Sequence, residues 1–312
     1  MSDVESISVV LCTYNRAAAL RHTFDLLAFL RIPDGLGVEF VVVDNNSTDE
    51  TREVCLAFRS SAQAPVEYCF EPKPGLSHAR NHGVGRARSD VVLFTDDDID
   101  VPAEWLEGYL STYRRHRADA VFGRITPDWG RGRPSWFHPK LGPIYGFLDY
   151  GDREHVVSSR RQEFFGANFS VRRTLLQDIG AFDTSLGRTP DALYISEERK
   201  VFLELINRRC TVVYNPELHV RHRVSDVMKS RSYVKKYYRD TAVSMVNMTP
   251  GGSKRALLGV PYYRIVEAVE AVAMFVPRSL KALVSGDRNA IFPLRLEMAR
   301  SLRICFLHLR RR

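Results

Sequence analysis

The first third of the chain alternates apolar runs with segments of helical periodicity. Residues 7–12, 38–43, 66–70 and 91–94 form apolar runs with little polar alternation, which is typical of strands buried on both faces of a parallel sheet. Between the first two runs, apolar residues recur at helical spacing from Leu20 to Leu30. The alternation continues to about residue 120 and predicts βαβ units with right-handed crossovers.

Two serines predict where the next helices begin. Ser47, with Glu50 three residues later, predicts a capping box for the helix after the second strand. Ser77 is the predicted cap of a helix of small residues that continues to Ala87. Both serines are therefore interpreted as structural residues.

The remaining chain is irregular at first and helical later. Residues 124–163 are rich in Gly, Pro and Arg and predict a long loop. The aromatic residues of this loop either stack on a flat ligand such as a sugar or form a core under the loop; they are Trp129, Trp136, Phe137 and Tyr145. Further strands are expected at 164–171 and 211–214, and further helices at 196–206, 230–248, 256–284 and 289–309.

Polar side chains follow the predicted strands at the point where each strand ends. Thr13 follows the first strand, Asp44 the second, and Asp96, Asp97 and Asp98 the fourth. The carboxyl ends of parallel strands share one edge of a sheet, where open α/β sheets bind ligands, so these residues should converge. Three neighbouring carboxylates repel one another and favour an oxygen-ligated cation such as Mg²⁺ or Mn²⁺, shared with substrate phosphates.

The charge of the chain indicates an anionic partner. The 312 residues carry a net charge of +8, with much of the basic excess in the last third, which suits a nucleotide, an anionic membrane or a nucleic acid. No nucleic-acid reading motif accompanies this charge, so a nucleic-acid role is least favoured. The arginine-rich C-terminal segment either lies on an anionic membrane or packs on the first domain or a partner subunit; its basic residues include Arg295, Arg300, Arg303 and residues 310–312.

Cysteine usage and the N-terminus favour a cytosolic protein. The five cysteines are scattered without a C-x-x-C pair, so neither a zinc site nor a disulfide framework is expected. The acidic N-terminus leads directly into a strand, unlike a signal peptide. A P-loop and a Gly-x-Gly-x-x-Gly after the first strand are both missing, which disfavours Walker-type ATPases and dinucleotide enzymes.

Six short motifs give the chain a recognisable pattern. They occur in order between residues 7 and about 222, and each is weak alone. They are residues 9–16 (VVLCTYNR), 43–49 (VDNNSTD), 75–81 (GLSHARN), 94–98 (FTDDD), 166–168 (GAN) with 180–183 (GAFD), and 197–198 (EE). Together they resemble the family-2 glycosyltransferases with the GT-A fold. The resemblance implies a mixed, mainly parallel α/β sheet with helices on both faces, over residues 1–224, followed by a basic helical extension over residues 225–312.

The resemblance also implies which residues bind the donor. The family transfers a sugar from a nucleotide diphosphate, usually a UDP-sugar, with inversion and with Mn²⁺ or Mg²⁺ as cofactor. Asp98 corresponds to the residue that ligates the metal, and the metal bridges the two phosphates. The residues expected to contact the nucleotide are Thr13, Tyr14, Asn15, Asp44, Arg80, Asp96 and Asp97, of which Asp97 has the weakest claim.

A general base should lie opposite the leaving group. The resemblance places it at Glu198, the second acid of the pair; Glu197 remains an alternative, since Glu in place of the family's Asp alters the alignment. Asp191 is a third candidate, and acids in a first helical turn also stabilise a helix without catalytic duty. Resemblance further makes His222, with His219 shortly before it, an additional metal or phosphate contact, and Asn168 a residue supporting the acceptor side.

These expectations combine into one functional prediction. The chain should be a non-processive inverting glycosyltransferase acting on a hydroxyl of a glycan or lipid-linked acceptor, in cell-surface polysaccharide synthesis. The Gln-x-x-Arg-Trp signature and the channel helices of processive relatives are missing after residue 222. The protein is expected in the cytoplasm or peripherally on the inner face of the plasma membrane. The alternatives are a nucleotidyltransferase and a catalytically silent nucleotide-sugar or glycan-binding protein.

Overall fold

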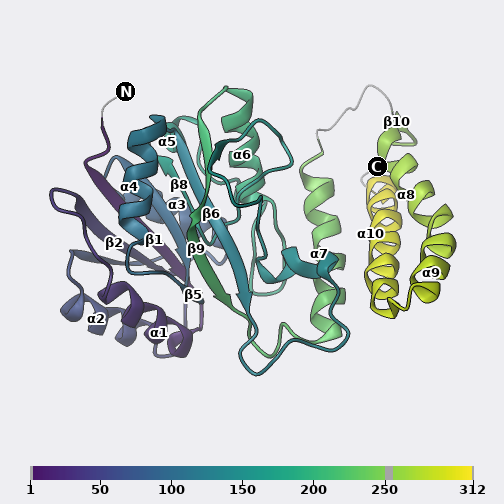
Figure 1. The fold of residues 1–312 in the computed structure, drawn as a ribbon, viewed down its shortest axis with the longest axis horizontal. Helices are drawn as coiled ribbons and strands as arrows, with labels where there is room; N and C mark the ends of the chain where they lie inside the picture. Colours follow the sequence, from purple (N-terminus) through teal and green to yellow (C-terminus); the bar gives the residue numbers. More distant parts are fainter. Residues whose placement is uncertain (1–2, 250–255, 311–312) are drawn as a thin grey trace. The chain divides into compact units, whose positions relative to one another are not determined.

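The computed structural model describes residues 3–249 and 256–310 (Figure 1). The chain divides into two compact units. The first unit comprises residues 1–128, 146–190 and 197–223, and the second comprises residues 129–145, 191–196 and 224–312. Two short segments from the first 224 residues, 129–145 and 191–196, therefore belong to the second unit.

A nine-stranded sheet forms the centre of the first unit. The apolar runs predicted as buried strands are its middle strands, and their side chains are almost completely buried. The order along the sheet is β3 (Val66–Phe70), β2 (Gly37–Asp44), β1 (Ser6–Thr13), β4 (Val91–Asp96), β8 (Phe169–Arg172), β6 (Ala120–Asp128), β9 (Val212–Arg223) and β5 (Ile99–Asp100), with β7 (His155–Val156) paired to β9.

Parallel pairing places the carboxyl ends of neighbouring strands at the same edge of the sheet. β1 pairs in parallel with β2 and β4, and β2 with β3, as the βαβ pattern predicts. In this register Thr13 lies opposite Asp44, and Cys12 lies opposite Asp96. β8 runs antiparallel to both β4 and β6, which makes the sheet mixed. The predicted fold class, mainly parallel α/β with C-terminal helices, is confirmed.

Helices flank the sheet of the first unit (Figure 1). α3 packs on β1 and β2, and α4 packs on β6 and β9. The approach of α3 depends on Gly83, because a Cβ at this position would lie 2.5 Å from Val10 Cγ1. The helices are α1 (Ala17–Ala28), α2 (Thr51–Ser61), α3 (Leu76–Arg86), α4 (Trp105–His116), α5 (Arg173–Asp178) and α6 (Glu197–Asn207).

Both predicted helix caps are wrong. α2 begins at Thr51, and Asp49 Oδ1, not Ser47, accepts the hydrogen bond from the Thr51 backbone N–H at 3.1 Å. Ser77 lies inside α3, where its hydroxyl donates to the carbonyl of Leu186 at 2.8 Å. Each serine side chain is used to hold a distant loop instead of its own helix.

Several predicted elements differ in extent. Residues 124–128, expected in a loop, continue strand β6 in parallel with β9. The strand expected at 164–171 is confined to Phe169–Arg172, and the strand expected at 211–214 extends to Arg223. The helix expected over 256–284 begins with a short hairpin at 256–261, where Gly259 and Pro261 interrupt the helical pattern, and the remainder is divided into two helices at Met274.

The second unit is helical. α10 (Ile291–Arg310) packs on α7 (Arg231–Asn247), α8 (Tyr262–Ala273) and α9 (Phe275–Val284). Shorter elements complete it: η1 (Pro139–Tyr145), η2 (Arg288–Ala290), β10 (Ala256–Leu257) and β11 (Val260–Pro261). Arg311 and Arg312, predicted in the basic tail, lie outside the described residues. Within residues 3–249 and 256–310, no helix combines the length and hydrophobicity needed to cross a membrane.

The aromatic residues of the predicted long loop form a core in the second unit. Tyr145 is buried, and Trp129 and Phe137 pack against it at ring-centroid distances of 4.8 and 5.8 Å. Trp136 contacts the ring of Phe292 edge-on and lies under the guanidinium of Arg231. Of the two interpretations left open for these residues, packing in a core is the one that the contacts support.

We expect Gly83→Ala to destabilise the first unit. The added methyl group would clash with Val10 behind α3, and overpacking of this kind costs about 1–3 kcal/mol. Gly85→Ala in the same helix is the matched control, because a Cβ there meets nothing within 4 Å, and it should be neutral or stabilising by up to about 1 kcal/mol. Chemical denaturation of both variants measures the difference, and equal stabilities would contradict the packing argument.

Candidate active site

The carboxyl edge of the central strands gathers the predicted polar residues. Thr13 and Asp44 end β1 and β2 side by side, and Asp96 ends β4 next to Cys12. Thr13 then reaches past its own strand, because its hydroxyl donates to Asp97 Oδ2 at 2.7 Å. The structure thus brings together residues that are more than 80 positions apart in the sequence, as the strand pattern predicts.

Asp97 and Asp98 are both buried and share one arginine. Arg16, three residues after the end of β1, contacts Asp97 Oδ1 with Nε at 3.1 Å and Asp98 Oδ2 with Nη2 at 2.8 Å. Burial opposes ionisation of Asp98, but the charges of His222, Arg16 and Arg188 outweigh it and lower the pKa of Asp98. Burial raises the pKa of Asp97 to about 7, against the influence of Arg16, and the charge of Asp98 adds to the rise. Asp98 is therefore the ionised acid at neutral pH.

The surroundings of Asp98 fit a divalent cation that is shared with a ligand. His222 of β9 places Nε2 3.4 Å from Asp98 Oδ2. The described part of the chain gathers no group of three or more His, Cys, Asp or Glu side chains suited to a metal ion. One carboxylate and one imidazole are nevertheless an adequate protein contribution for Mg²⁺ or Mn²⁺, which commonly take further ligands from substrate phosphates and water.

His219 does not join this arrangement. It lies three residues before His222 on β9, so the two side chains point to opposite faces of the strand. Its Nε2 is 2.7 Å from the hydroxyl of Thr126. Burial, together with the charges of Arg124 and Arg221, lowers the pKa of His219. The expectation that His219 accompanies His222 at the metal is therefore wrong.

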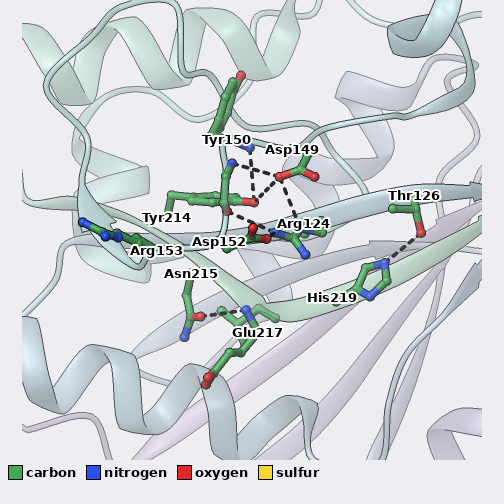
Figure 2. A network of polar contacts seen from close by, with 12 residues as sticks. Arg124, Thr126, Asp149, Tyr150, Asp152, Arg153, Tyr214, Asn215, Glu217 and His219 are labelled. Carbon is green, nitrogen blue, oxygen red and sulfur yellow. Dashed lines mark hydrogen bonds and ion pairs between the residues drawn. The ribbon is translucent and has the colours of Figure 1, made fainter. Parts of the chain in front are cut away.

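Figure 2 shows a polar network around Arg124, with the separate hydrogen bond between His219 and Thr126 to its right. Arg124 of β6 contacts Asp149 at 3.3 Å and Asp152 at 2.6 Å, both in the loop after residue 146. The hydroxyl of Tyr214 on β9 donates to Asp149 at 3.3 Å. These contacts connect the loop to β6 and to β9, and β9 is the strand that carries both His219 and His222.

Asp44 and Asn15 organise the loops at the strand ends. Asp44 is buried and accepts hydrogen bonds from the Ser47 backbone N–H and the Tyr68 hydroxyl, both at 2.9 Å. Asn15 accepts from the Thr48 N–H at 2.7 Å and its own N–H donates to Ser47 Oγ. Tyr14 is exposed beside them. The nucleotide contacts expected of Tyr14, Asn15 and Asp44 stay predictions.

Arg80 connects this strand edge to the glutamate pair. It comes from α3, is 2 % exposed, and places Nη1 2.9 Å from Glu197 Oε1 and 3.1 Å from Glu198 Oε1. Its Nη2 is 3.6 Å from Asp96 Oδ1. Burial opposes the charge of Arg80, but Glu198, Glu197 and Asp96 raise its pKa above the usual range. The guanidinium is thus a fixed cation between acids of β4 and α6.

Two further predicted residues lie elsewhere. Asn168 is 1 % exposed and makes internal hydrogen bonds only: Oδ1 accepts from Trp105 and Tyr109 of α4, and Nδ2 donates to the carbonyls of Leu218 and Arg124. Asn168 therefore connects α4, β6 and β9 inside the first unit. Asp191 is exposed in the second unit, where its carbonyl accepts a hydrogen bond from Lys236.

Two arginines at this edge had been given no role by the sequence pattern. Arg16 stands in the motif of residues 9–16, yet its contacts with Asp97 and Asp98 depend on a turn that returns it to the strand edge. Arg188 lies in the loop between α5 and α6, and its charge acts on Asp96 and Asp98. For Arg16 the available signal was its place at the end of this motif, whereas Arg188 lies outside every motif and every periodic pattern named above.

A family comparison agrees with this geometry. Residues 8–180 match the family model described as "Glycosyl transferase family 2". The chain belongs to this family. Its fold, its glycosyltransferase class and the predicted family resemblance are confirmed.

Similar proteins in the family act in glycan synthesis. The chain is 27% identical over 230 residues to a glucosyl-dolichyl phosphate glucuronosyltransferase of Haloferax volcanii, covering 70% of this chain and 69% of that protein. It is 25% identical over 231 residues to the succinoglycan biosynthesis protein ExoM of Rhizobium meliloti, covering 74% and 71%.

Solved GT-A transferases share the fold. The mannosyltransferase PcManGT from Pyrobaculum calidifontis, in complex with GDP-Man and Mn²⁺, has a TM-score of 0.63 at 16% identity and covers 97% of this chain and 88% of that chain. Staphylococcus aureus TarS 1–349 in complex with UDP-GlcNAc has a TM-score of 0.53 at 21% identity, covering 78% and 67%. At these identities the likeness shows the fold alone.

We expect Arg80→Met to destabilise the first unit strongly at neutral pH. Removal of the cation leaves Glu197 without its hydrogen-bond donor and leaves the charges of Glu198 and Asp96 without their shared partner, a change that should cost about 1–3 kcal/mol. The loss should shrink at acidic pH, where the carboxyl groups take up protons. Urea denaturation at pH 7.5 and pH 5 measures both effects. Arg86→Met in the same helix is the control, since its exposed pair with Glu67 is worth no more than about 1 kcal/mol.

Proposed function

We propose that this protein transfers a sugar, with inversion, from a nucleotide-diphosphate donor to a hydroxyl group of a glycan or lipid-linked acceptor. The carrying observation is Arg80, a buried guanidinium in contact with Asp96 at the strand edge and with the glutamate pair of α6. It holds a donor-side acid and two candidate bases in one fixed group. An inverting displacement needs these two sides to face each other across the reacting carbon.

Asp98 and His222 would hold the cation at the donor side. When bound, the metal would stabilise the negative charge that develops on the diphosphate leaving group. Arg16 and Arg188 add positive charge around the same acids. Thr13, Tyr14, Asn15, Asp44, Arg80, Asp96 and Asp97 are the proposed nucleotide contacts; Thr13 orients Asp97, and Asp44 orients the loop at Ser47.

Glu198 is the proposed general base. The acceptor oxygen would form a bond to the anomeric carbon while the bond from that carbon to the diphosphate oxygen breaks. The leaving group departs with the electron pair, and the hydroxyl proton passes to Glu198. The Glu198 side chain is 17 % exposed, whereas that of Glu197 is 3 % exposed, so Glu198 is the more accessible of the two.

Similar proteins support the proposed donor and acceptor classes. TarS and PcManGT are known in complex with UDP-GlcNAc and GDP-Man, and the Haloferax relative is named for a dolichyl phosphate-linked sugar. A UDP-sugar is our first choice of donor. The missing Gln-x-x-Arg-Trp signature supports addition of one sugar at a time.

A screen of nucleotide-sugars tests this proposal. UDP-glucose, UDP-glucuronic acid, UDP-GlcNAc and GDP-mannose are each incubated with the protein, with Mn²⁺ or with EDTA, and nucleotide release and thermal shift are measured. We expect metal-dependent release from one donor, with loss of at least about 100-fold in Asp98→Asn. Release of labelled nucleotidyl product would favour a nucleotidyltransferase. Binding without turnover, with acceptor glycans present, would favour a silent binding protein.

We further propose that the second unit contacts an anionic membrane. In the described ranges, 15 of the 22 exposed large apolar side chains lie between residues 257 and 309, which marks an interaction surface. Val276, Leu280, Leu283 and Val284 lie along one side of α9, with Lys281 beside them. Residues 256–310 carry eight basic and four acidic residues. This excess repels a second copy and attracts anionic headgroups.

Vesicle binding tests the membrane proposal. The protein should sediment with phosphatidylcholine vesicles that contain phosphatidylglycerol, and added salt should weaken the binding because the charges are screened. Leu280→Asp combined with Leu283→Asp should lower binding at least about tenfold. Phe29→Asp, which changes an exposed apolar residue of the first unit, should leave binding intact. Equal binding by both variants would contradict the proposed surface.

A further inference from the structure

The glutamate pair and its partner carry an excess of negative charge. Arg80 supplies one positive charge to Glu197, Glu198 and Asp96, at distances of 2.9, 3.1 and 3.6 Å. A buried anion is costly unless it is paired and fully hydrogen-bonded. The charge of Arg188 also acts on Asp96, but Arg80 is the cation paired with both Glu197 and Glu198, so the arrangement favours an additional proton on one of these two.

The buried carboxyl group of Glu197 is the most favourable position for this proton. Glu197 is 2 % exposed, and within the described residues its Oε2 has no hydrogen-bond partner. An ionised carboxylate would leave this oxygen desolvated and unbonded, which is unfavourable by about 1–3 kcal/mol. The Asp96 and Glu198 side chains are more exposed, at 33 % and 17 %, so solvent reaches their oxygens. Burial also raises the pKa of Asp96, but the charges of Arg80 and Arg188 oppose the rise.

Two glycines allow the backbone to approach Glu197 and Glu198 closely. A Cβ at residue 166 would lie 1.9 Å from Arg80 Nη2 and 2.4 Å from Glu198 Oε1. A Cβ at residue 187 would lie 2.6 Å from Ser77 Oγ and 3.3 Å from the carboxyl carbon of Glu197. The backbone therefore closes over both glutamates, and neither can move away from the other without rearranging its surroundings.

We propose that Glu197 is protonated in the working enzyme and is a positioning residue, which holds Arg80 and the neighbouring Glu198 so that Glu198 alone receives the acceptor proton. This inference rests on the proposed function. It assigns proton acceptance to Glu198 and positioning to Glu197. Arg80 keeps its contact with both, while the net charge of the buried group is lowered by one.

Titration of the site agrees with this geometry. Burial raises the pKa of Glu197 to about 8, and the charge of Glu198 adds to the rise while Arg80 opposes it. The charged and titratable groups facing the pair are Arg80 of α3, Asp96 of β4 and, on the far side of Arg80, Cys12 of β1. Glu163, which is paired with Arg199, also faces Glu198, whose charge acts on it. Because Glu197 is protonated in the folded protein and ionised in the unfolded chain, stability should fall as pH rises from about 4.5 to about 8.

Infrared spectroscopy tests the proton without a substrate. The metal-free protein should show the C=O stretching band of a protonated carboxyl at pH 7, and part of it should vanish with an apparent pKa near 8. Glu197→Gln should remove this part, and Glu198→Gln should retain a protonated carboxyl. Asp97→Asn is the matched control, because Asp97 has a pKa raised to about 7 and contributes a band of its own. A spectrum unchanged by Glu197→Gln overturns the proposal.

Kinetics test the division of labour. Nucleotide release from the most active of the four donors above is followed between pH 6 and 10. Glu198→Gln should lower kcat at least about 100-fold with little change in KM. Glu197→Ala should lower kcat about tenfold or more, and Glu197→Gln should restore most of that loss. We expect wild-type activity to decline above pH 8, where Glu197 ionises, and Glu197→Gln should remove this decline. A purely structural Glu197 would leave the alkaline limb in place.

The outcomes separate this inference from the proposed function. If Glu197→Gln is the inactive variant and Glu198→Gln keeps wild-type turnover, the assignment is reversed and the inference fails while the transferase proposal stands. If the wild-type protein releases nucleotide from none of the donors, the proposed function fails, and the infrared band still decides whether Glu197 carries the proton. Thermal melting of each variant confirms that it is folded.

Discussion

The contact between Arg80 and the acids around it is the interaction on which the site depends. A buried guanidinium is unfavourable alone, and here it is stabilised by Glu197, Glu198 and Asp96 and by the ring of Phe182, 5.5 Å away. Glu197 and Glu198 follow Arg80 by more than 110 residues, so the contact forms only when α6 has docked beside the sheet. It fixes the carboxylates relative to the strand edge, and the same requirement that stabilises the fold therefore sets the geometry of the site.

The strand half of this arrangement could be predicted from the sequence. Apolar runs without alternation imply parallel strands, and parallel strands place their carboxyl ends on one edge. The strand pattern therefore predicts that Thr13 and Asp44 lie at one edge, and the observed register of β1 and β2 places them directly opposite each other. The pattern of residues along single strands determines these neighbours, which is why local reasoning succeeded for β1, β2 and β4.

The other half depends on long-range contacts that no local pattern records. Serine is a common helix-capping residue, yet the hydroxyls of Ser47 and Ser77 form hydrogen bonds with distant loops. Ser47 Oγ accepts from the Asn15 backbone N–H, and the Ser77 hydroxyl donates to the Leu186 carbonyl. Arg188 lies in a loop without periodicity and gains its role only where the loop folds back. The loop aromatics, including Trp129, fit both stacking and packing on composition, and only the contacts of the second unit distinguish the two.

The glutamate pair shows how a departure from a family pattern is accommodated physically. Glu in place of Asp carries its carboxyl one methylene further from the backbone, and a base must still be held at a fixed distance from its partner. The space is provided opposite, since residue 166 is glycine and any side chain there would overlap both Glu198 and Arg80. A Cβ at this position would lie nearer to the guanidinium of Arg80 than to the carboxyl of Glu198. Because residues 166–168 are themselves one of the family motifs, Arg80 requires the glycine whichever acid stands at position 198, and the same opening also accommodates the longer side chain of Glu198.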